Sequence, residues 1–288
     1  MPKSPTIVLT GGTSGIGRLA AIELARQGAH LVLTARDKAK AAATRATLEA
    51  AAPGVRVDFH YADFASLDAV AAVAAEINLR YERIDVLINN AGIHAFEQRI
   101  TVDGLAEMVA VNYLAPWLLT NSLRRKLVLS SPSRIVTVAS RASRRVTELV
   151  PGRDIHDTAP FSRMGSSRVY GRTKLMNIMF SQELARQLQD AGVAVNCLCP
   201  GFNVTGLGRE LGFAAPLERI LNRLRIGDPR LGAGIIVRLS SGPDFGSVTG
   251  GYFAAKDAKP LWPGPPADDA KARHELWSAT STLLAPLL

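Results

Sequence analysis

Short apolar runs alternate with stretches in which apolar residues recur at helical spacing along almost the whole chain. The apolar runs predict strands at 6–10, 30–34, 56–61, 84–88, 133–140, 193–199 and 251–254. The stretches between them predict helices, one ending near Arg26 and the others spanning 38–51, 66–81, 101–111, 112–130, 167–190 and 228–241. Strands and helices that alternate in this way build a doubly wound parallel sheet. We therefore expect an α/β fold of about seven strands with helices on both faces.

We expect residues 1–288 to form a single domain, because the alternation runs on without a repeat or a second fold. Three segments depart from it. Residues 144–165 are polar and contain prolines and glycines, which indicates a surface insertion. Residues 202–226 carry apolar residues at helical spacing, broken by glycines and a proline, which is typical of a lid over a substrate. Residues 267–285 follow a proline-rich connector and predict a C-terminal helical extension.

The composition is that of an ordinary globular protein, with 47% apolar and 20% charged residues. A net charge of +9 makes nucleic acid a candidate partner. However, the basic residues are scattered, and the densest groups, at 124–126 and 141–145, lack interleaved aromatic residues. We therefore expect no nucleic-acid partner and attribute the excess to a solvated surface that attracts an anionic cofactor.

The cysteines and the apolar runs bear on the compartment. Cys197 and Cys199 lie two positions apart in one predicted strand, so both face the same side and are poorly placed to form a disulfide. Reduced thiols favour a cytoplasmic protein. No window approaches the ~18 uninterrupted apolar residues of a transmembrane helix, and 1–5 lacks signal-peptide features. We expect a soluble protein without a membrane anchor.

A glycine-rich turn joins the first strand to the first helix. It reads Thr-Gly-Gly-Thr-Ser-Gly-Ile-Gly, and its candidate cofactor-binding residues are Gly11, Thr13, Ser14, Gly15, Ile16 and Gly17. Glycines let the backbone approach a pyrophosphate closely, and the helix that follows offers unpaired N–H groups and a positive dipole end. The alternative is an ordinary strand-to-helix turn. The position after the first strand favours a dinucleotide-binding, Rossmann-type fold.

Arg36 follows the second strand, where a fold that prefers NAD(H) would place an acid for the ribose hydroxyls. A guanidinium suits a 2′-phosphate, so we predict NADP(H) as the cofactor, with NAD(H) as the less favoured alternative. Asp37 is better placed to cap the next helix. Asp63, after the third strand, either bonds the adenine amine or begins a turn.

Two amides and two small residues follow the fourth strand, as Asn89-Asn90-Ala91-Gly92. At the carboxyl end of a parallel strand, such residues would let the backbone run beside the ribose and nicotinamide of a dinucleotide. An asparagine-rich turn is the alternative. We take Asn90, Ala91 and Gly92 as candidate cofactor contacts.

Tyr170 and Lys174 lie four positions apart in a predicted helix and therefore share one face. An ammonium beside a phenol favours its phenolate form, so this pair could move a proton to or from a carbonyl or alcohol oxygen. Alone, the spacing also fits a solvated tyrosine and a surface lysine. Ser140 lies thirty positions earlier, at the end of the fifth strand.

Taken together, these motifs resemble the classical short-chain dehydrogenase/reductase (SDR) family over nearly the whole chain. The matching stretches are TGGTSGIG at 10–17, Asp63, NNAG at 89–92, Asn112, Ser140, Tyr170 with Lys174, and PGFNVT at 200–205. The resemblance implies an oxidoreductase that transfers hydride between NADP(H) and a carbonyl or alcohol. It requires no metal, so we expect none.

The resemblance also implies roles for individual residues. Ser140 would bond the substrate oxygen, and Tyr170 would be the general acid/base. Lys174 would bind the nicotinamide ribose and favour the tyrosinate, while Asn112 would hold a water in a proton relay. Asn90 and Thr205 would contact the nicotinamide end of the cofactor. Pro200 and Gly201 would shape the wall beside it.

Two features are similar to the retinol dehydrogenase and protochlorophyllide reductase-like branch: the long gap from Ser140 to Tyr170 and the closing sequence at 272–281. Ala139 departs from the second serine frequent in the family, and 1–5 carries no anchor of the kind in animal retinol dehydrogenases, which argues against a retinoid. We predict a lipophilic ketone or aldehyde as substrate, and a homodimer or homotetramer. The alternatives are a non-catalytic dinucleotide sensor and a C=C reductase.

Overall fold

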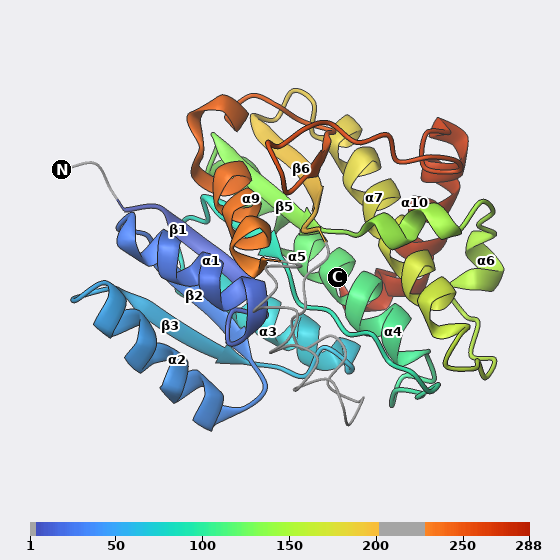
Figure 1. The fold of residues 1–288 in the computed structure, drawn as a ribbon, viewed down its shortest axis with the longest axis horizontal. Coiled ribbons are helices and arrows are strands. Elements are labelled where there is room, and N and C mark those ends of the chain that lie inside the picture. The colour runs from blue at the N-terminus through green and yellow to red at the C-terminus, as the bar shows by residue number, and fades with distance from the viewer. Residues whose placement is uncertain (1–3, 202–227) are drawn as a thin grey trace.

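The computed structural model describes residues 4–201 and 228–288. Thr205 and the predicted lid at 202–226 lie outside the described residues. The seven strands of the described chain form one parallel sheet in the order β3-β2-β1-β4-β5-β6-β7 (Figure 1). The strands are β1 (Thr6–Thr10), β2 (His30–Ala35), β3 (Val57–Tyr61), β4 (Val86–Asn89), β5 (Ser133–Val138), β6 (Val193–Cys199) and β7 (Tyr252–Ala254). The predicted doubly wound fold is therefore confirmed.

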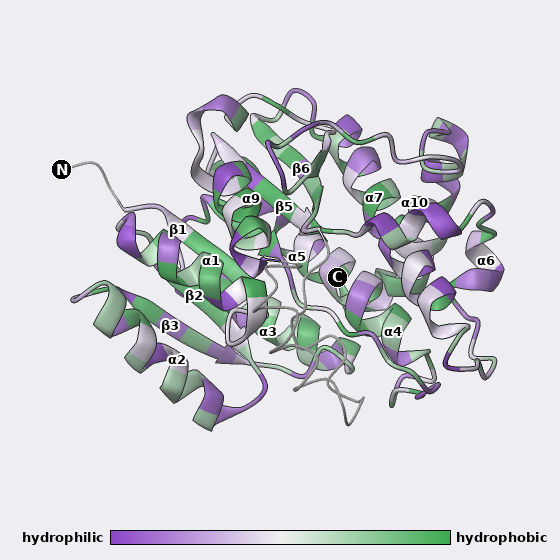
Figure 2. Cartoon of the chain, viewed as in Figure 1, coloured by the Kyte–Doolittle hydropathy of each residue, from purple (hydrophilic) through white to green (hydrophobic). Residues whose placement is uncertain are grey.

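Helices cover both faces of the sheet. One face is covered by α1 (Gly15–Arg26), α2 (Lys38–Ala51) and α9 (Pro229–Ser241). The other is covered by α3 (Leu67–Arg80), α5 (Ala115–Leu129) and α7 (Ser166–Gln187), with α10 (Ala270–Leu284) outside them. In Figure 2 the central strands are largely hydrophobic, whereas the helices carry hydrophobic and hydrophilic residues on different sides. Two apolar cores, one on each face, pack the helices against the sheet. This packing holds the carboxyl ends of the strands in place.

The predicted cap of α2 is confirmed, and α3 begins with a cap of the same kind. The Asp37 side chain accepts a hydrogen bond from the N–H of Lys40 at the start of α2, and Ser66 caps α3 through Ala69 in the same way. Each bond satisfies one of the backbone donors that a helix N-terminus leaves unpaired. Cys197 and Cys199 are buried, free and packed into the same core, as expected for side chains on one face of β6.

The prediction of two helices that meet at Asn112 is wrong. A single helical stretch runs from Glu107 to Leu129, through α4 (Glu107–Val109), the π-helical turn η1 (Ala110–Leu114) and α5. The wider turn allows the Asn112 carbonyl to accept a hydrogen bond from Asn177 Nδ2 at 2.8 Å. Apolar periodicity alone does not reveal a π turn, because the apolar face continues through it.

The insertion is tied to the body of the protein. The 3₁₀ helix η2 (Arg141–Arg145) leads into it, and the insertion contains α6 (Pro151–Asp154) and buries Asp154 together with Ile155. Arg172 of α7 reaches into it, contacting Asp154 Oδ1 at 3.0 Å and Asp157 Oδ2 at 2.8 Å. These ion pairs join the insertion to the helix that carries Tyr170.

The closing helix α10 packs on α7. Trp277 lies 5.3 Å from the ring of Trp117 and is stacked 5.9 Å from that of Phe180. The hydroxyl groups of Tyr113 and Thr280 form a buried hydrogen bond of 2.6 Å. The chain's own C-terminal helix thus covers the outer side of α5 and α7. Two short 3₁₀ helices, η3 (Pro243–Phe245) and η4 (Ala285–Leu287), complete the described elements. No helix of the described chain is long and apolar enough to cross a membrane.

Candidate active site

A cavity of about 570 Å³ opens at the carboxyl edge of the sheet. It lies where the strand order reverses between β1 and β4, which is the usual ligand site of a doubly wound sheet. Most of the predicted site residues line it: Gly11, Thr13, Ser14, Gly15, Ile16, Gly17, Arg36, Asp63, Asn90, Ala91, Gly92, Ser140, Tyr170, Lys174, Pro200 and Gly201. Asn112 lies outside this lining, and Thr205 lies outside the described residues.

Two positions of the glycine turn cannot carry a side chain. The turn therefore leaves room for a ligand. Gly11 has φ +68°, a conformation that side chains disfavour. A β carbon at Gly17 would lie 2.4 Å from both Asn90 Nδ2 and the Gly11 carbonyl oxygen. The N-cap of α1, Ser14, makes no side-chain capping bond. The first N–H groups of α1 are therefore available to an anion, so this turn fits the pyrophosphate of a dinucleotide.

Asn90 lines the cavity and also stabilises the glycine turn through hydrogen bonds. Its Nδ2 donates to the carbonyls of Thr10 at 2.9 Å and Gly11 at 3.1 Å, while Thr10 Oγ1 accepts from the backbone N–H groups of Asn90 and Ala91 at 3.0 Å. These bonds fasten the glycine turn to the end of β4. The predicted contact between Asn90 and the nicotinamide end stays a prediction.

Arg36 and Asp63 face each other across the far end of the cavity, where β2 and β3 end. Their side chains are 63% and 54% exposed and approach to 3.6 Å. Such an exposed pair is weak, so the guanidinium can exchange Asp63 for a phosphate at little cost. Asp63 Oδ1 also accepts the N–H of Ala65 at 3.0 Å, which supports its role in the turn before α3.

Ser140 and Tyr170 are brought together by the close packing of η2 on α7. The Ser140 Oγ accepts from the N–H of Ala142 at 3.1 Å, which caps η2. A β carbon at Gly171 would lie 2.4 Å from the Ala142 carbonyl oxygen, so glycine alone allows this approach. The result is a side-chain hydrogen bond between Ser140 and Tyr170.

Tyr170 is held in its protonated form. Burial raises the pKa of the phenol above its ordinary value, and the hydrogen bond with Ser140 opposes this only in part. The Lys174 Nζ lies 5.7 Å from the ring centroid of Tyr170 and donates to the Val138 carbonyl at 2.9 Å. The sequence suggested that the ammonium would favour the phenolate. Burial is the largest cause of the shift, and the predicted effect of Lys174 on the phenolate stays a prediction.

Lys174 itself is 3% exposed, and burial lowers its pKa to about 8. Its neighbour across the cavity is Gly92, where a β carbon would lie 3.3 Å from Nζ and 3.2 Å from Asn112 Oδ1. The absence of a side chain at Gly92 therefore keeps the ammonium accessible from the cavity. An ammonium with a pKa near neutrality is well suited to respond to an anionic ligand.

Asn112 stands behind the cavity wall, fully buried. Its side chain accepts from the N–H of Ile93 at 2.8 Å and donates to the Ile93 carbonyl at 2.9 Å and to Thr173 Oγ1 at 3.1 Å. These bonds tie the segment after β4 to α7. The role of holding a water in a proton relay stays a prediction.

His94 also lines the cavity, although no sequence motif pointed to it. Its ring stacks on that of Tyr170, with centroids 4.7 Å apart and planes at 22°. The two residues lie far apart in the sequence, so no local spacing could have paired them. Ile93, Val111 and Val138 add an apolar part to the same wall.

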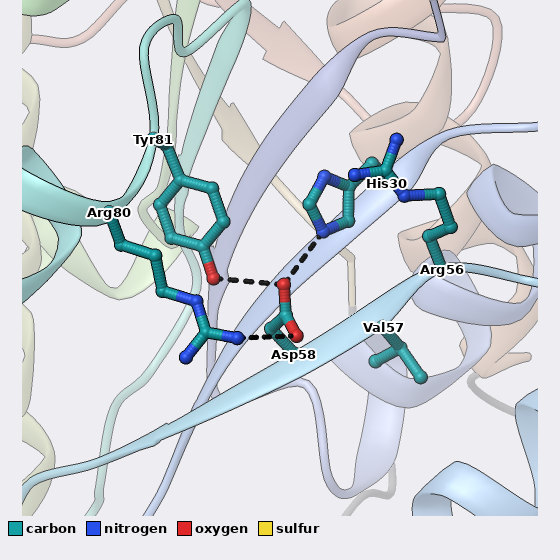
Figure 3. A pocket seen from close by; sticks show the side chains of 6 residues that line it. All are labelled: His30, Arg56, Val57, Asp58, Arg80 and Tyr81. Atoms are coloured by element: carbon teal, nitrogen blue, oxygen red, sulfur yellow. Dashed lines mark hydrogen bonds and ion pairs between the residues drawn. The ribbon is translucent and has the colours of Figure 1, made fainter.

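A second cavity, of about 450 Å³, lies at the opposite, amino-terminal edge of the sheet (Figure 3). His30 and the Tyr81 hydroxyl contact one oxygen of Asp58 at 2.8 and 3.0 Å, and Arg80 contacts the other at 3.2 Å. Burial acts to raise the pKa of Asp58, but the hydrogen bonds from His30 and Tyr81 and the charge of Arg80 together outweigh it and hold that pKa below its usual value. These groups pair with one another and fasten the end of α3 to β2 and β3. Across the described residues, no group of three or more His, Cys, Asp or Glu side chains could hold a metal ion.

Fold and site together define a dinucleotide-binding oxidoreductase with a serine, tyrosine and lysine at its centre. The sequence model of the short chain dehydrogenase family matches residues 5–151. Human retinol dehydrogenase 13 is 34% identical over 97% of this chain and 84% of its own length, and human retinol dehydrogenase 14 is 36% identical over 98% and 87%. The chain belongs to the short-chain dehydrogenase family. It is an oxidoreductase of that family, and its relatives include the retinol dehydrogenases.

Solved structures with the same fold support this family assignment. An uncharacterised protein from Mycobacterium paratuberculosis superposes with a TM-score of 0.72, at 27% identity, over 98% of this chain and 93% of its own. A short chain dehydrogenase from Burkholderia cenocepacia in complex with NADP gives a TM-score of 0.66 at 26% identity, over 87% of this chain and 95% of its own. The family uses nicotinamide dinucleotides, and the glycine turn of this chain fits one.

Proposed function

We propose that this protein is an NADP(H)-dependent enzyme that interconverts a lipophilic ketone or aldehyde and its alcohol, with Tyr170 as general acid/base. The observation that carries the proposal is the convergence of Ser140, Tyr170 and Lys174 in one cavity with the glycine turn. A non-catalytic dinucleotide sensor has no need of these three side chains at one point.

The bound dinucleotide supplies the hydride for reduction and takes it up in oxidation. Ser140 and Tyr170 share a hydrogen bond, so a substrate oxygen placed between them receives donors from both. Tyr170 gives its proton to that oxygen in reduction and recovers one in oxidation. Because burial raises the pKa of Tyr170, the phenol is held protonated and can act as the acid in reduction.

Lys174 acts on the phenolate that proton transfer would leave. At 5.7 Å from the centroid of the Tyr170 ring, its ammonium is close enough to stabilise that charge. It also borders Gly92, where the nicotinamide ribose would lie by family resemblance. Asn112 holds the intervening segment in place through Ile93.

The choice of NADP(H) rests on Arg36, an exposed guanidinium at the end of β2 that Asp63 engages weakly. The relative from Burkholderia cenocepacia binds NADP, which is consistent with this choice. The proposed substrate class rests on the apolar wall of Ile93, Val111 and Val138 and on relatives named as retinol dehydrogenases. We further propose a cytoplasmic protein, supported by two buried free thiols, and a homodimer or homotetramer by family resemblance.

The test is NADPH oxidation by the purified protein across a panel of carbonyls. The panel contains decanal, benzaldehyde and all-trans-retinal as apolar members, and glyceraldehyde and methylglyoxal as small polar ones. We expect kcat/KM to be highest for an apolar member and higher with NADPH than with NADH. Better turnover of the small polar carbonyls would refute the substrate class, and a preference for NADH would refute the role of Arg36.

A further inference from the structure

His94 forms the middle of a three-ring stack beside the proposed acid/base. On one side its ring lies 4.7 Å from that of Tyr170, with the planes at 22°. On the other side it lies 4.8 Å from the ring of Phe96, at 30°. Among the described residues, the ring that contacts Tyr170 face to face is that of His94. The phenol thus has a flat partner on one face, and Lys174 lies 5.7 Å from the ring centroid.

The edge of the His94 ring is anchored as well as its face. Its Nε2 lies 3.2 Å from Ser166 Oγ. The Ser166 hydroxyl has a single proton, which it donates to the Arg163 carbonyl at 2.7 Å. Ser166 Oγ therefore accepts the proton of His94 Nε2. Ser166 is fully buried and is the first residue of α7, so this bond joins the segment after β4 to the start of the helix that carries Tyr170.

We infer that His94 is a positioning residue that holds the phenol of Tyr170 at the angle required for proton transfer. The inference rests on the proposed function, because it assumes that Tyr170 is the acid/base. A tyrosine ring turns about two side-chain bonds, and the hydrogen bond with Ser140 restrains only its hydroxyl end. A stacked ring removes the remaining freedom to tilt. A misplacement of about 1 Å at a reacting atom costs roughly a hundredfold in rate, so this restraint has a catalytic consequence.

The geometry argues against a second acid/base role for His94. In a stack of 22° the faces of the two rings meet, so the ring nitrogens do not point at the Tyr170 hydroxyl. Nε2 is directed at Ser166 instead. The effect of His94 on turnover should therefore depend on its ring and survive the loss of its nitrogens.

Two substitutions separate these roles. His94→Ala removes the ring, whereas His94→Phe keeps a flat ring of similar size and removes the bond to Ser166. His156→Ala, an exposed histidine of the insertion, serves as the matched control. Each variant is assayed for reduction of decanal with NADPH, which yields kcat and KM, and for NADPH affinity by fluorescence. Thermal unfolding monitored by circular dichroism verifies that the variants fold.

We expect His94→Ala to lower kcat by about 10- to 100-fold while KM and the NADPH affinity stay within about threefold, and His94→Phe to restore most of kcat. The control should match the wild type. In NMR spectra of protein with labelled tyrosine, the Tyr170 ring signals should shift in His94→Ala and keep their wild-type positions in His94→Phe.

Two results would overturn the inference: an unchanged kcat in His94→Ala, or Tyr170 ring signals that do not move in that variant. Tyr170→Phe, assayed in parallel, distinguishes failure of the positioning role of His94 from failure of the proposed function. If it is inactive and His94→Ala is fully active, the positioning role fails and the proposed function stands. If Tyr170→Phe itself turns over normally, the proposed function fails.

Discussion

Gly171 lies directly against the backbone of η2: a β carbon there would be 2.4 Å from the Ala142 carbonyl oxygen. Tyr170 immediately precedes this glycine, and Ser140 stands two residues before Ala142. The contact therefore sets the distance between the two hydroxyl groups that would bind a substrate oxygen. One hydrogen atom in place of a side chain brings the serine and the tyrosine together.

Gly171→Ala should separate them. The methyl group must push η2 away from α7, because an approach of 2.4 Å is too short for any real contact. We expect a loss of about 1–3 kcal/mol in the free energy of unfolding, typical of overpacking, and a fall in kcat larger than that in NADPH affinity. Chemical denaturation and steady-state kinetics measure both. Gly234→Ala, in α9 where an added β carbon would meet no atom of the described residues within 4 Å, is the control and should be neutral or stabilising.

Arg36→Ala should remove the preference for NADPH. An exposed guanidinium that bonds a 2′-phosphate contributes about 1.5–3 kcal/mol, which corresponds to a roughly 10- to 100-fold loss of NADPH affinity with little change for NADH. Fluorescence titration with both cofactors tests this. The control is Arg26→Ala, since Arg26 is an exposed arginine at the C-terminal end of α1. This substitution should change the affinity for neither cofactor. Equal losses for NADPH and NADH in Arg36→Ala would contradict the assignment.

The affinity for NADPH should fall as the pH rises through about 8. Burial lowers the pKa of Lys174 to that value, so its ammonium is fully present below it and is lost above it. The phosphate groups of the cofactor are already ionised above pH 7, since their second pKa is about 6. Lys174→Met should bind more weakly and show a flatter profile between pH 7 and 9. A wild-type profile as flat as that of the variant would count against a contact between Lys174 and the cofactor.

The insertion should loosen in acid. Burial acts to raise the pKa of Asp154, but the hydrogen bonds from Arg153 and Val150 and the charge of Arg172 outweigh it and hold that pKa below its usual value. The stabilisation is therefore present above about pH 4, the unfolded-state pKa, and is lost as the pH falls further. Asp154→Asn should reproduce the loss at neutral pH, at about 1–3 kcal/mol.

Hydrogen exchange across 146–158 measures this opening. The matched control is Asp157→Asn, because Asp157 shares Arg172 but its side chain is 31% exposed against 2% for Asp154, so its replacement should cost less. Equal effects of the two substitutions on hydrogen exchange would show that the burial of Asp154 adds nothing to the stability of the insertion.

The fold was accessible from the sequence because local patterns determine it. The apolar run at 193–199 coincides with β6, and Asp37 caps α2 through a bond that spans three residues. The motifs located the cavity for a similar reason: the glycine turn and the residues after β4 end at one edge of a parallel sheet, whatever the details of packing.

What the sequence missed depends on contacts between distant residues. The π turn at 110–114 is stabilised in part by a hydrogen bond from Asn177. The stack of His94 on Tyr170 joins a loop and a helix that lie far apart in the sequence. The raised pKa of Tyr170 also depends on distant residues, because a four-residue spacing reveals the neighbouring ammonium but not the burial of the phenol. Asn112 and Asn90 matched family positions, yet their side chains bind backbone groups of neighbouring segments.

Tyr170→Phe removes only the hydroxyl that would transfer the proton, so its turnover decides whether Tyr170 is the general acid/base. The measurement is the single-turnover rate of NADPH oxidation with the best carbonyl of the panel, with Tyr61→Phe, an exposed tyrosine, as control. We predict that Tyr170→Phe lowers this rate by roughly 100- to 10,000-fold, with NADPH affinity retained and the control unaffected. A rate in Tyr170→Phe within a few-fold of the wild type would show that Tyr170 does not transfer the proton.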